Sequence, residues 1–528
     1  MGRGGRPRPD RAAHLRPGRS AARRRRRGAV GRTAPRGPSA ETRGEENPIM
    51  LNRRHLLKAA VVGGAAALFP WEGLSGSGSA AAAGDLAETV PFAHALPVPK
   101  TLAPLSRSAT TDVYEMRMRE ADVEIVKGLT SRVRTFDGTF PGPTIKACHG
   151  RAVEVRQYND LTVNAAVHLH GGEVHSEHDG LPMDVIAPGG NRTYHYPNQQ
   201  RAASLWYHDH AHHLEAENVY KGLHGLYLIS DAEEKKLPLP RGAYDVPLVI
   251  RDARVETDGT LRYTRPSDCP HMLVNGKERP YFKVAARKYR LRLYNACANR
   301  YIRLRLADGT PFTQIASDGG LLERPVQRDE LLMLGGERVE VVVDFSRYAV
   351  GQSVVLENTG ALPTERPEVL RFDIDRRSTD NSQVPARLST LPPVPRGAVE
   401  RDFELRTFPA MTINGVSYDP DRVDVATTVG SSEIWTIRNV EAPLAAPPDF
   451  HLYHSFHTHL TYFRVLERNG RPAGVQDSGL KDTVCLGPGE TVKIAMTWGP
   501  YTGQYLYHCH QLGHSSGGQM GRIDINPA

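Results

Sequence analysis

Short stretches in which apolar and polar residues alternate recur along most of the chain. Glycine, proline or asparagine residues separate these stretches. Alternation with a period of two puts the apolar side chains on one face of a strand. The pattern predicts an all-β protein whose half-buried strands form antiparallel sheets, in β-sandwiches or Greek-key barrels. Examples are RAVEVRQYN (151–159), KYRLRLYNA (288–296), ERVEVVVDF (337–345), ETVKIAMTW (490–498) and GRIDI (521–525).

Internal repetition predicts that these strands are divided among three similar domains. LVNGK (273–277) and TINGV (412–416) have the pattern of equivalent strand–turn units that open successive domains. We place the domains at 86–240, 241–400 and 401–528, with a proline-rich linker over 361–400. The clearest repeats are HLH (168–170) and WYHDH (206–210), then HTH (457–459) and YLYHCH (505–510), with Gly-x-x-Gly segments at 222–225 and 518–521.

The N-terminal part differs in composition from the rest of the chain. Residues 1–49 are rich in arginine, glycine and proline and include RRRRR at 23–27. Such a segment cannot bury a core, so we expect a disordered extension, or sequence upstream of a true start at Met50. A nucleic-acid-binding arm is the alternative.

Residues 50–83 have the pattern of an export signal. Arg53 and Arg54 precede a short apolar run, Ala59–Phe69, and the small residues at 79–85 offer a cleavage site. The run is too short to span a bilayer as a stable helix. The paired arginines resemble a twin-arginine signal, so we expect export to the cell surface, periplasm or medium, without a stable membrane anchor. A buried or interfacial helix is the alternative.

Charge and cysteine content exclude two further classes. The net charge of +8 arises in residues 1–58, which hold 17 Lys/Arg and 4 Asp/Glu and leave 50 against 55 elsewhere. The folded body is therefore not predicted to bind nucleic acid. The five cysteines, at 148, 269, 297, 485 and 509, have no CxxC zinc spacing, and their odd number leaves at least one free.

The histidines are concentrated in two regions of the sequence. Ten of 22 lie in 168–224 and seven in 451–514, whereas 225–450 contains only His271. Residues i and i+2 of a strand point to the same side, so each His-x-His projects two imidazoles into one space. Four such pairs predict two or three metal ions between the first and third domains: His168/His170, His208/His210, His457/His459 and His508/His510.

Cys509 predicts a second, different metal site. Because it stands between two histidines of a strand, its sulfur points to the opposite face, where His454 and His514 are within reach. One thiolate and two imidazoles form the trigonal site of blue copper, whose weak axial ligand is Met or Gln. A zinc site would need four firm ligands.

With these motifs, the sequence resembles the multicopper oxidases over roughly residues 95–528, and within them the three-domain spore-coat laccases and bilirubin oxidases. Beside the copper segments, the resemblance rests on YHYPNQQRAASLWYHDH (194–210), GLYLISDAEEKKLPLPRGAYDVPLVI (225–250), QIASDGGLLERPV (314–326) and WGPYTGQYLYHCH (498–510). It implies three cupredoxin domains, of which the second holds no copper.

The resemblance also implies which residues bind four copper ions. His454, Cys509 and His514 match the type 1 ligands, and His168 and His457 match type 2. The type 3 pair is matched by His170, His208, His210, His459, His508 and His510. Asp179 matches an acidic residue that supplies protons near the cluster; otherwise it is an ordinary turn aspartate before Gly180.

Two positions depart from the family pattern. The axial position, usually Met, Leu or Phe ten residues after the cysteine, is Gln519, and Met520 follows it. We expect Gln519 to be the axial ligand, because a step of one residue turns the side chain to the other face of a strand. The residue after the last histidine, usually Glu, is Ser515, which puts the supply of protons in doubt.

The implied activity is that of a laccase-like enzyme. It would oxidise phenolic, aromatic or bilirubin-like donors by one electron at type 1 copper and reduce dioxygen to water at the trinuclear cluster. The implied partners are dioxygen, a small aromatic reductant and the twin-arginine export machinery, and we expect a monomer. A ferrous or cuprous oxidase, or a copper-binding coat protein with weak activity, are the alternatives; ten methionines without a Met-rich insertion argue against cuprous oxidation. The loop 440–454 is expected to influence the choice of substrate.

Overall fold

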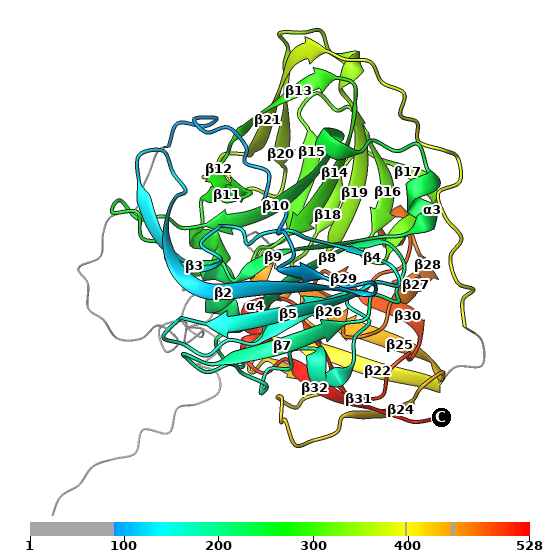
Figure 1. Ribbon diagram of the computed structural model, residues 1–528. Helices are drawn as coiled ribbons and strands as arrows, with labels where there is room; N and C mark the ends of the chain where they lie inside the picture. Colours follow the sequence, from blue (N-terminus) through cyan, green and yellow to red (C-terminus); the bar gives the residue numbers. More distant parts are fainter. Residues whose placement is uncertain (1–88, 396–398, 445–448) are drawn as a thin grey trace, which may run out of the picture. The chain divides into compact units, whose positions relative to one another are not determined.

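The computed structural model describes residues 89–395, 399–444 and 449–528, in which strands predominate (Figure 1). The predicted extension (1–49) and signal (50–83) lie outside the described residues. The strands form six sheets, which pack as three successive pairs. The domain limit predicted at residue 240 falls between the first two pairs, and the limit predicted at 400 falls within β22 (Val399–Arg406), at the start of the third pair; the division into domains stays a prediction.

The first pair of sheets encloses a core of apolar side chains from both sheets, such as Met116, Val155 and Leu205. One sheet contains β1 (Ser106–Arg107), β2 (Thr111–Glu124), β3 (Thr130–Phe136), β5 (Ala152–Asn159) and β7 (Asn191–Tyr196). The other contains β4 (Ile145–Cys148), β6 (Val167–His170), β8 (Ala203–Asp209) and β9 (His224–Ser230). This second sheet carries the first two His-x-His pairs.

The second pair encloses its own core, with Leu291, Val341 and Leu304 among its members. Its seven-stranded sheet contains β10 (Asp245–Ala253), β11 (His271–Val274), β12 (Lys277–Glu278), β14 (Lys288–Asn295), β16 (Phe312–Ser317), β17 (Gly320–Arg328) and β19 (Arg338–Asp344). The partner sheet contains β13 (Tyr281–Ala286), β15 (Ile302–Leu306), β18 (Leu331–Met333), β20 (Ser353–Asn358) and β21 (Glu368–Arg377).

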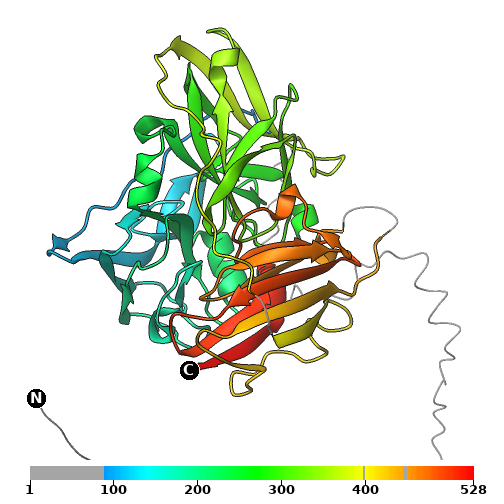
Figure 2. The ribbon, with the colours of Figure 1, turned by 90° about the vertical axis from the view of Figure 1, so that its right-hand side faces the viewer.

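The third pair, yellow to red in Figure 2, is closed by an aromatic core around Trp435, Phe456 and Tyr507. One sheet contains β22 (Val399–Arg406), β23 (Thr412–Ile413), β25 (Ser432–Asn439), β27 (Phe463–Arg468), β28 (Arg471–Pro472) and β30 (Thr491–Thr497). The other contains β24 (Val425–Thr428), β26 (His454–Thr458), β29 (Thr483–Leu486), β31 (Gly503–Cys509) and β32 (Met520–Asn526).

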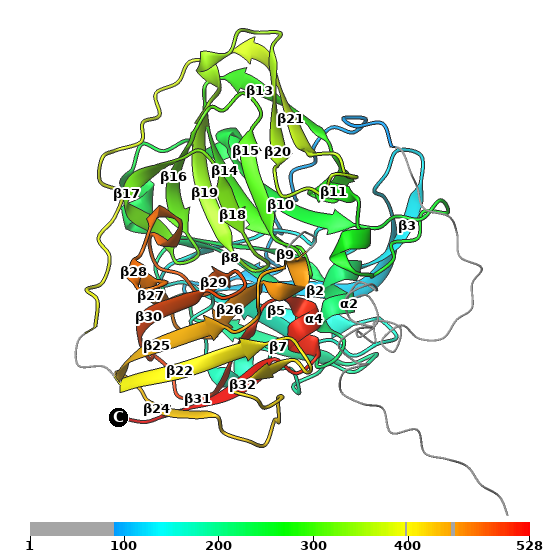
Figure 3. The same cartoon turned by 180° about the vertical axis from the view of Figure 1, so that it is seen from behind.

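The α-helices of the described residues are short: α2 (Glu215–Lys221), α3 (Ala232–Lys236) and α4 (Leu512–Ser516). Helix α2 follows the first histidine segments, and α4 carries His514. The two helices lie side by side although almost 300 residues separate them, as Figure 3 shows. They therefore join the first and third pairs of sheets beside the histidines.

The expectation that the sheets are purely antiparallel is wrong. Each of the six sheets contains one parallel pair of strands: β2/β5, β4/β9, β10/β14, β13/β21, β22/β25 and β24/β32. The chain crosses to the partner sheet between the members of each pair, so both members run in the same direction. The same crossing in all three pairs of sheets indicates three copies of one fold.

The predicted linker over 361–400 is wrong in part. Strand β21, residues 368–377, lies inside this range and pairs with both β13 and β20. Its sequence EVLRFDIDRR alternates, and Leu370, Phe372 and Ile374 are buried in the second core. Because prolines lie on both sides of the strand, the proline content of 361–400 predicted a linker, and the alternation within it was missed.

Two glycines confirm the repeat that joins the first and third pairs of sheets. Gly225 faces Tyr207 across β8 and β9, and Gly521 faces Tyr507 across β31 and β32. A Cβ atom at either glycine would meet the tyrosine hydroxyl oxygen, at 2.2 Å and 2.4 Å. The second glycine of each Gly-x-x-Gly segment is therefore required by a bulky tyrosine on the neighbouring strand.

Candidate metal centre

The four His-x-His segments lie on two pairs of neighbouring antiparallel strands or directly after them. His168 faces His208 across β6 and β8, and His457 faces His508 across β26 and β31. Side chains of directly opposed residues lie on the same face of a sheet. Each sheet therefore brings four imidazoles to one place.

The two sets of four rings meet and form one buried cluster. The ring of His168 stacks on that of His459 with centroids 3.9 Å apart, and His170 stacks on His457 at 3.8 Å. All eight side chains are at most 1% exposed. The first and third pairs of sheets thus each supply half of the cluster, as the sequence predicts.

Nitrogen atoms of the rings converge in the middle of the cluster. The Nε2 atoms of His459 and His508 are 3.2 Å apart, and those of His208 and His510 are 3.3 Å apart. His170 turns Nδ1 inward, 3.1 Å from Nε2 of His510. Buried polar atoms without partners are costly. Three more nitrogens, Nε2 of His168, His210 and His457, have no hydrogen-bond partner. This donor set fits metal ions that accept the convergent lone pairs.

Seven of the eight outer nitrogens, all except that of His510, face acceptors that fix the orientation of the rings. Second ring nitrogens of metal-binding histidines usually donate in this way. Backbone carbonyls accept from Nδ1 of His168, His208, His457 and His508, at 2.6, 2.9, 2.7 and 3.1 Å. Carboxylates face the outer nitrogens of His459 (Asp179, 2.6 Å), His170 (Asp482, 3.0 Å) and His210 (Glu215, 3.4 Å).

Burial also keeps these rings in the neutral form that binds metals. It lowers the pKa of His459 to about 4, and the pKa values of six other cluster histidines fall well below their usual range. Desolvation is the largest cause in each case, because it disfavours the charged imidazolium. Neutral imidazole is the state in which histidine binds a metal.

Asp179 lies against two of the rings. It is fully buried after the 3-10 turn Ser176–His178, and its carboxylate accepts from Nδ1 of His459 while its carbonyl accepts from His168. Burial acts to raise the pKa of Asp179, but its electrostatic interactions and hydrogen bonds with His459 and His168 outweigh this, so the pKa is below its usual value. In this position Asp179 orients ligands; its predicted part in proton supply stays a prediction.

Sequence reasoning missed Asp482 and Arg338. The carboxylate of Asp482 meets His170 and forms a two-point ion pair with Arg338, both distances being 2.6 Å. Arg338 stands on β19 in the second pair of sheets and also donates to the carbonyl oxygen of Ser204 in the first. It therefore contacts all three pairs of sheets behind the cluster, although its own domain has no predicted ligand.

Cys509 lies on the opposite face of β31 from His508 and meets the other predicted pair of histidines. Its Sγ is 3.5 Å from Nδ1 of His454 and 3.6 Å from Nδ1 of His514. All three side chains are buried. Burial raises the pKa of the Cys509 thiol to about 12, whereas a metal ion removes the proton of a coordinating thiol. The arrangement is the trigonal set expected for a blue-copper site.

Gln519 occupies the same side of the sheet as this trigonal set. The backbone N–H of Cys509 donates to the carbonyl of Gln519, so these two residues oppose each other, while Met520 opposes His508. The amide nitrogen of Gln519 donates to the carbonyls of Arg406 and Thr412, at 2.8 and 3.3 Å. Its Oε1 atom is buried and has no hydrogen-bond partner among the described residues. Burial lowers the pKa of His454, and the side chain of Gln519 acts in the opposite direction.

Comparison with known proteins agrees with this geometry. Two family models, each described as multicopper oxidase, match residues 117–234 and 384–528. The laccase of Bacillus subtilis (strain 168) is 34% identical over 517 residues, which cover 82% of this chain and 98% of that protein. The chain belongs to the multicopper oxidase family.

Other multicopper oxidases support the assignment. A bilirubin oxidase of Albifimbria verrucaria is 36% identical over 441 residues and covers 77% of this chain and 75% of that protein. The crystal structure of a laccase from Pediococcus acidilactici has a TM-score of 0.76 at 30% identity, covering 83% of this chain and 95% of that one. The cupredoxin fold expected from the resemblance is confirmed.

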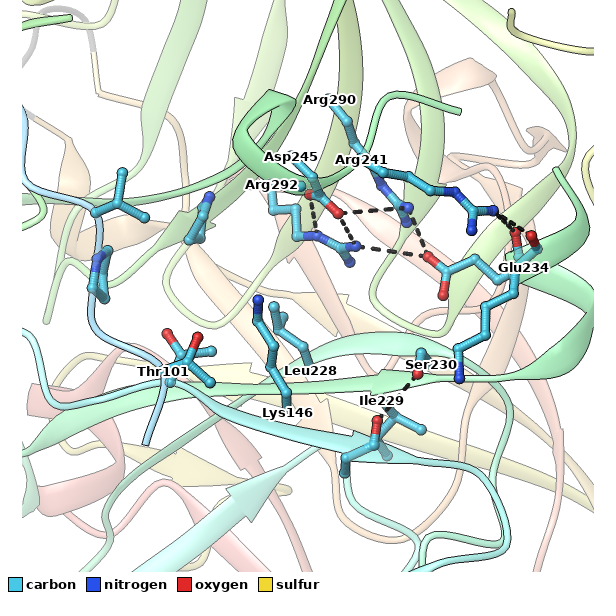
Figure 4. Close-up of a pocket in the computed structure, with 17 residues that line it drawn as sticks. Thr101, Lys146, Leu228, Ile229, Ser230, Glu234, Arg241, Asp245, Arg290 and Arg292 are labelled. Atoms are coloured by element: carbon cyan, nitrogen blue, oxygen red, sulfur yellow. Dashed lines mark hydrogen bonds and ion pairs between the residues drawn. The ribbon is translucent and has the colours of Figure 1, made fainter. Parts of the chain in front are cut away.

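The second cupredoxin domain has charged residues but no comparable cluster. Among the described residues, no group of three or more close His, Cys, Asp or Glu side chains includes a member of 241–400. A cavity of about 290 Å³ lies between this domain and the first (Figure 4). Two of its arginines form ion pairs: Arg292 with Asp245 at 2.7 Å and Arg290 with Glu234 at 2.6 Å. The second pair connects the two domains, the first lies within one domain, and neither contains a predicted ligand.

No helix within the described ranges is long and apolar enough to cross a membrane. All five cysteines are free thiols, so no disulfide links the domains.

Proposed function

We propose that this multicopper oxidase is laccase-like. It removes single electrons from phenolic, other aromatic or bilirubin-like donors and delivers them to dioxygen, which becomes water. The observation that carries the proposal is the back-to-back arrangement at Cys509. Its sulfur faces His454 and His514, and its two chain neighbours belong to the eight-histidine cluster.

Copper ions at the two sites would supply the redox chemistry. The type 1 site would be held by His454, Cys509, His514 and, axially, Gln519; type 2 by His168 and His457; and the type 3 pair by His170, His208, His210, His459, His508 and His510. The donor atoms support the separation of the type 1 site from the cluster, because a thiolate is typical of blue copper and imidazoles suit the other copper ions.

The protein residues provide a short route between the sites. Cys509 is bonded through the backbone to His508 and His510, so electrons need to cross only one residue of covalent chain on either side. The pairing of β26 with β31 holds His457 opposite His508 and fixes this geometry. Because the rings are buried and most of their outer nitrogens face acceptors, the ligands would keep their orientation when the copper ions change oxidation state.

Gln519 would set the potential of the type 1 copper, and with it the driving force for oxidation of the donor. An amide oxygen is a harder donor than a thioether, so it favours Cu(II) over Cu(I) and lowers the potential of the type 1 site. A low potential would restrict the enzyme to easily oxidised donors, such as ortho-substituted phenols or bilirubin-like pigments. We further propose, from Arg53 and Arg54 ahead of the short apolar run, that the enzyme acts outside the cytoplasm, and, separately, that it is a monomer.

The test is the stoichiometry of oxygen uptake. With a phenolic donor and copper-loaded protein, we expect one dioxygen consumed for every four donor electrons, and no oxygen returned on adding catalase. Cys509→Ser should show no uptake, because a hydroxyl does not replace the thiolate. Peroxide as the product, or an active Cys509→Ser variant, would contradict the proposal. Ferrous ion as the donor in the same assay tests the alternative. Faster oxidation of ferrous ion than of the phenolic donor would make the protein a metal oxidase.

A further inference from the structure

A carboxyl group is buried between the helices α2 and α4. Glu215 begins α2, yet it is only 2% exposed. First residues of short surface helices are normally hydrated, and burying a carboxyl group is costly unless it has partners. The partners of Glu215 therefore show why it is there.

Both oxygens of this carboxyl group are directed at the copper-site segments. Oε2 accepts a hydrogen bond from the hydroxyl of Ser515, at 2.5 Å. Oε1 lies 3.4 Å from Nδ1 of His210, which is the only ion-pair partner of Glu215 within the described residues. No lysine or arginine of that part of the chain pairs with it.

Among the outer nitrogens of the cluster, that of His210 faces the carboxyl group of Glu215. Seven of the eight outer nitrogens face an acceptor, and for His210 the acceptor is Glu215 alone. Neither nitrogen of His210 forms a hydrogen bond within the described residues, so Nδ1 meets Oε1 of Glu215 as an ion-pair contact at 3.4 Å. A ring with one nitrogen toward Glu215 must present the other, Nε2, to the cluster.

The partner serine is the residue at which this chain departs from the family pattern. Ser515 follows the predicted type 1 ligand His514, at the position where the resemblance to the family implies Glu. Its hydroxyl contacts Glu215 and also the backbone carbonyl of Leu512, at 3.1 Å. A second contact strengthens the junction, since the hydroxyl of Ser516 accepts from the backbone N–H of Ala216 at 3.3 Å.

We propose that Glu215 is a positioning residue of the trinuclear site, which takes over from helix α2 the place of the carboxyl group missing at position 515. Oε1 faces Nδ1 of His210 at 3.4 Å and would direct Nε2 to the metal, while the Ser515 hydroxyl holds Oε2. The inference rests on the proposed copper function. It adds a link between the helix that bears the type 1 ligand His514 and a type 3 ligand.

Copper retention tests this role more directly than turnover does. Loaded variants are dialysed against a chelator, and copper per chain is followed together with the blue colour of the type 1 site. Outer partners of metal-binding histidines typically contribute 10–100-fold to metal affinity. We expect Glu215→Ala to lose cluster copper on the order of 10–100-fold faster while the blue colour is retained.

Two variants separate positioning from packing. Glu215→Gln keeps an oxygen for His210 and a polar group for Ser515, so its copper loss should stay within a few-fold of the parent rate. Glu217→Ala removes a half-buried carboxyl of the same helix, paired with Arg134 at 3.4 Å, and should lose copper as the parent does. Equal retention by Glu215→Ala and Glu217→Ala would overturn the proposal.

Relocating the carboxyl group gives a second, independent test. Glu215→Ala/Ser515→Glu moves the group to the other helix across the same contact, and it should recover most of the retention lost in Glu215→Ala. A double variant no better than Glu215→Ala would contradict the exchange of roles. If Glu215→Ala does not fold, Ser515→Ala must show a smaller loss of cluster copper, and parent-like retention would refute the link. A colourless parent protein would instead refute the proposed function.

Discussion

Replacing Arg338 by methionine should destabilise the protein far more than replacing a surface arginine. Met has a similar length but no charge. Arg338 is 1% exposed, forms both hydrogen bonds of its ion pair with Asp482 at 2.6 Å, and donates to the carbonyls of Ser204, Gly336 and Asp318. Its loss leaves the Asp482 carboxylate buried without the guanidinium.

The magnitude follows from the burial of that ion pair. Removing one partner of a buried pair costs about 3–5 kcal/mol, because the remaining charge is uncompensated. The matched control is Arg305→Met in the same domain: Arg305 is 52% exposed and pairs with Glu357 at 3.4 Å. An exposed pair of this kind contributes about 0–1 kcal/mol.

Denaturant titration of the copper-free protein measures both free energies of unfolding, from the shift in midpoint and the m-value. Copper-free protein is required, because Asp482 also orients His170 and metal binding would add to the difference. Arg338→Met/Asp482→Leu should be more stable than Arg338→Met, since the stranded charge is gone. A loss below about 1 kcal/mol in Arg338→Met, equal to that of the surface control, would refute the reasoning.

Two other predictions follow from the geometry. Gln519→Met should raise the type 1 potential in a redox titration and Met520→Leu should leave it unchanged; the opposite pattern would assign the axial position to Met520. The buried His224, whose pKa burial lowers to about 3, gains a proton on unfolding below its unfolded pKa of about 6.5, so stability should fall as pH drops through this window. The contribution reaches about 2 kcal/mol at pH 5, and His224→Gln should remove it, whereas His195→Gln at an exposed site should not.

Much of the cluster could be predicted because its signal is local. A His-x-His segment on a strand fixes which side chains share a face, and the same periodicity puts the sulfur of Cys509 on the other face. The stacking of His168 on His459 needs no more than the meeting of two such sheets. The axial side of Gln519 also follows from its register with Cys509.

The residues around the ligands had no such signal. Asp482 and Arg338 belong to different domains and meet only through the packing of the three sheet pairs, which no local spacing encodes. Glu215 follows His210 by five residues, but its burial depends on α4. In the fold, β21 was missed because prolines near it dominated the composition, and the parallel pairs were missed because alternation does not reveal strand direction.

The central claim is that one buried cysteine and the two sets of histidines hold copper in two kinds of site. Copper analysis of the purified, copper-loaded protein, with a visible spectrum of the same sample, tests it most directly. We predict four copper ions per chain and an intense blue colour, and for Cys509→Ser one copper fewer and no colour. A protein that binds zinc in preference, that stays colourless when loaded, or that remains blue as Cys509→Ser would contradict the account.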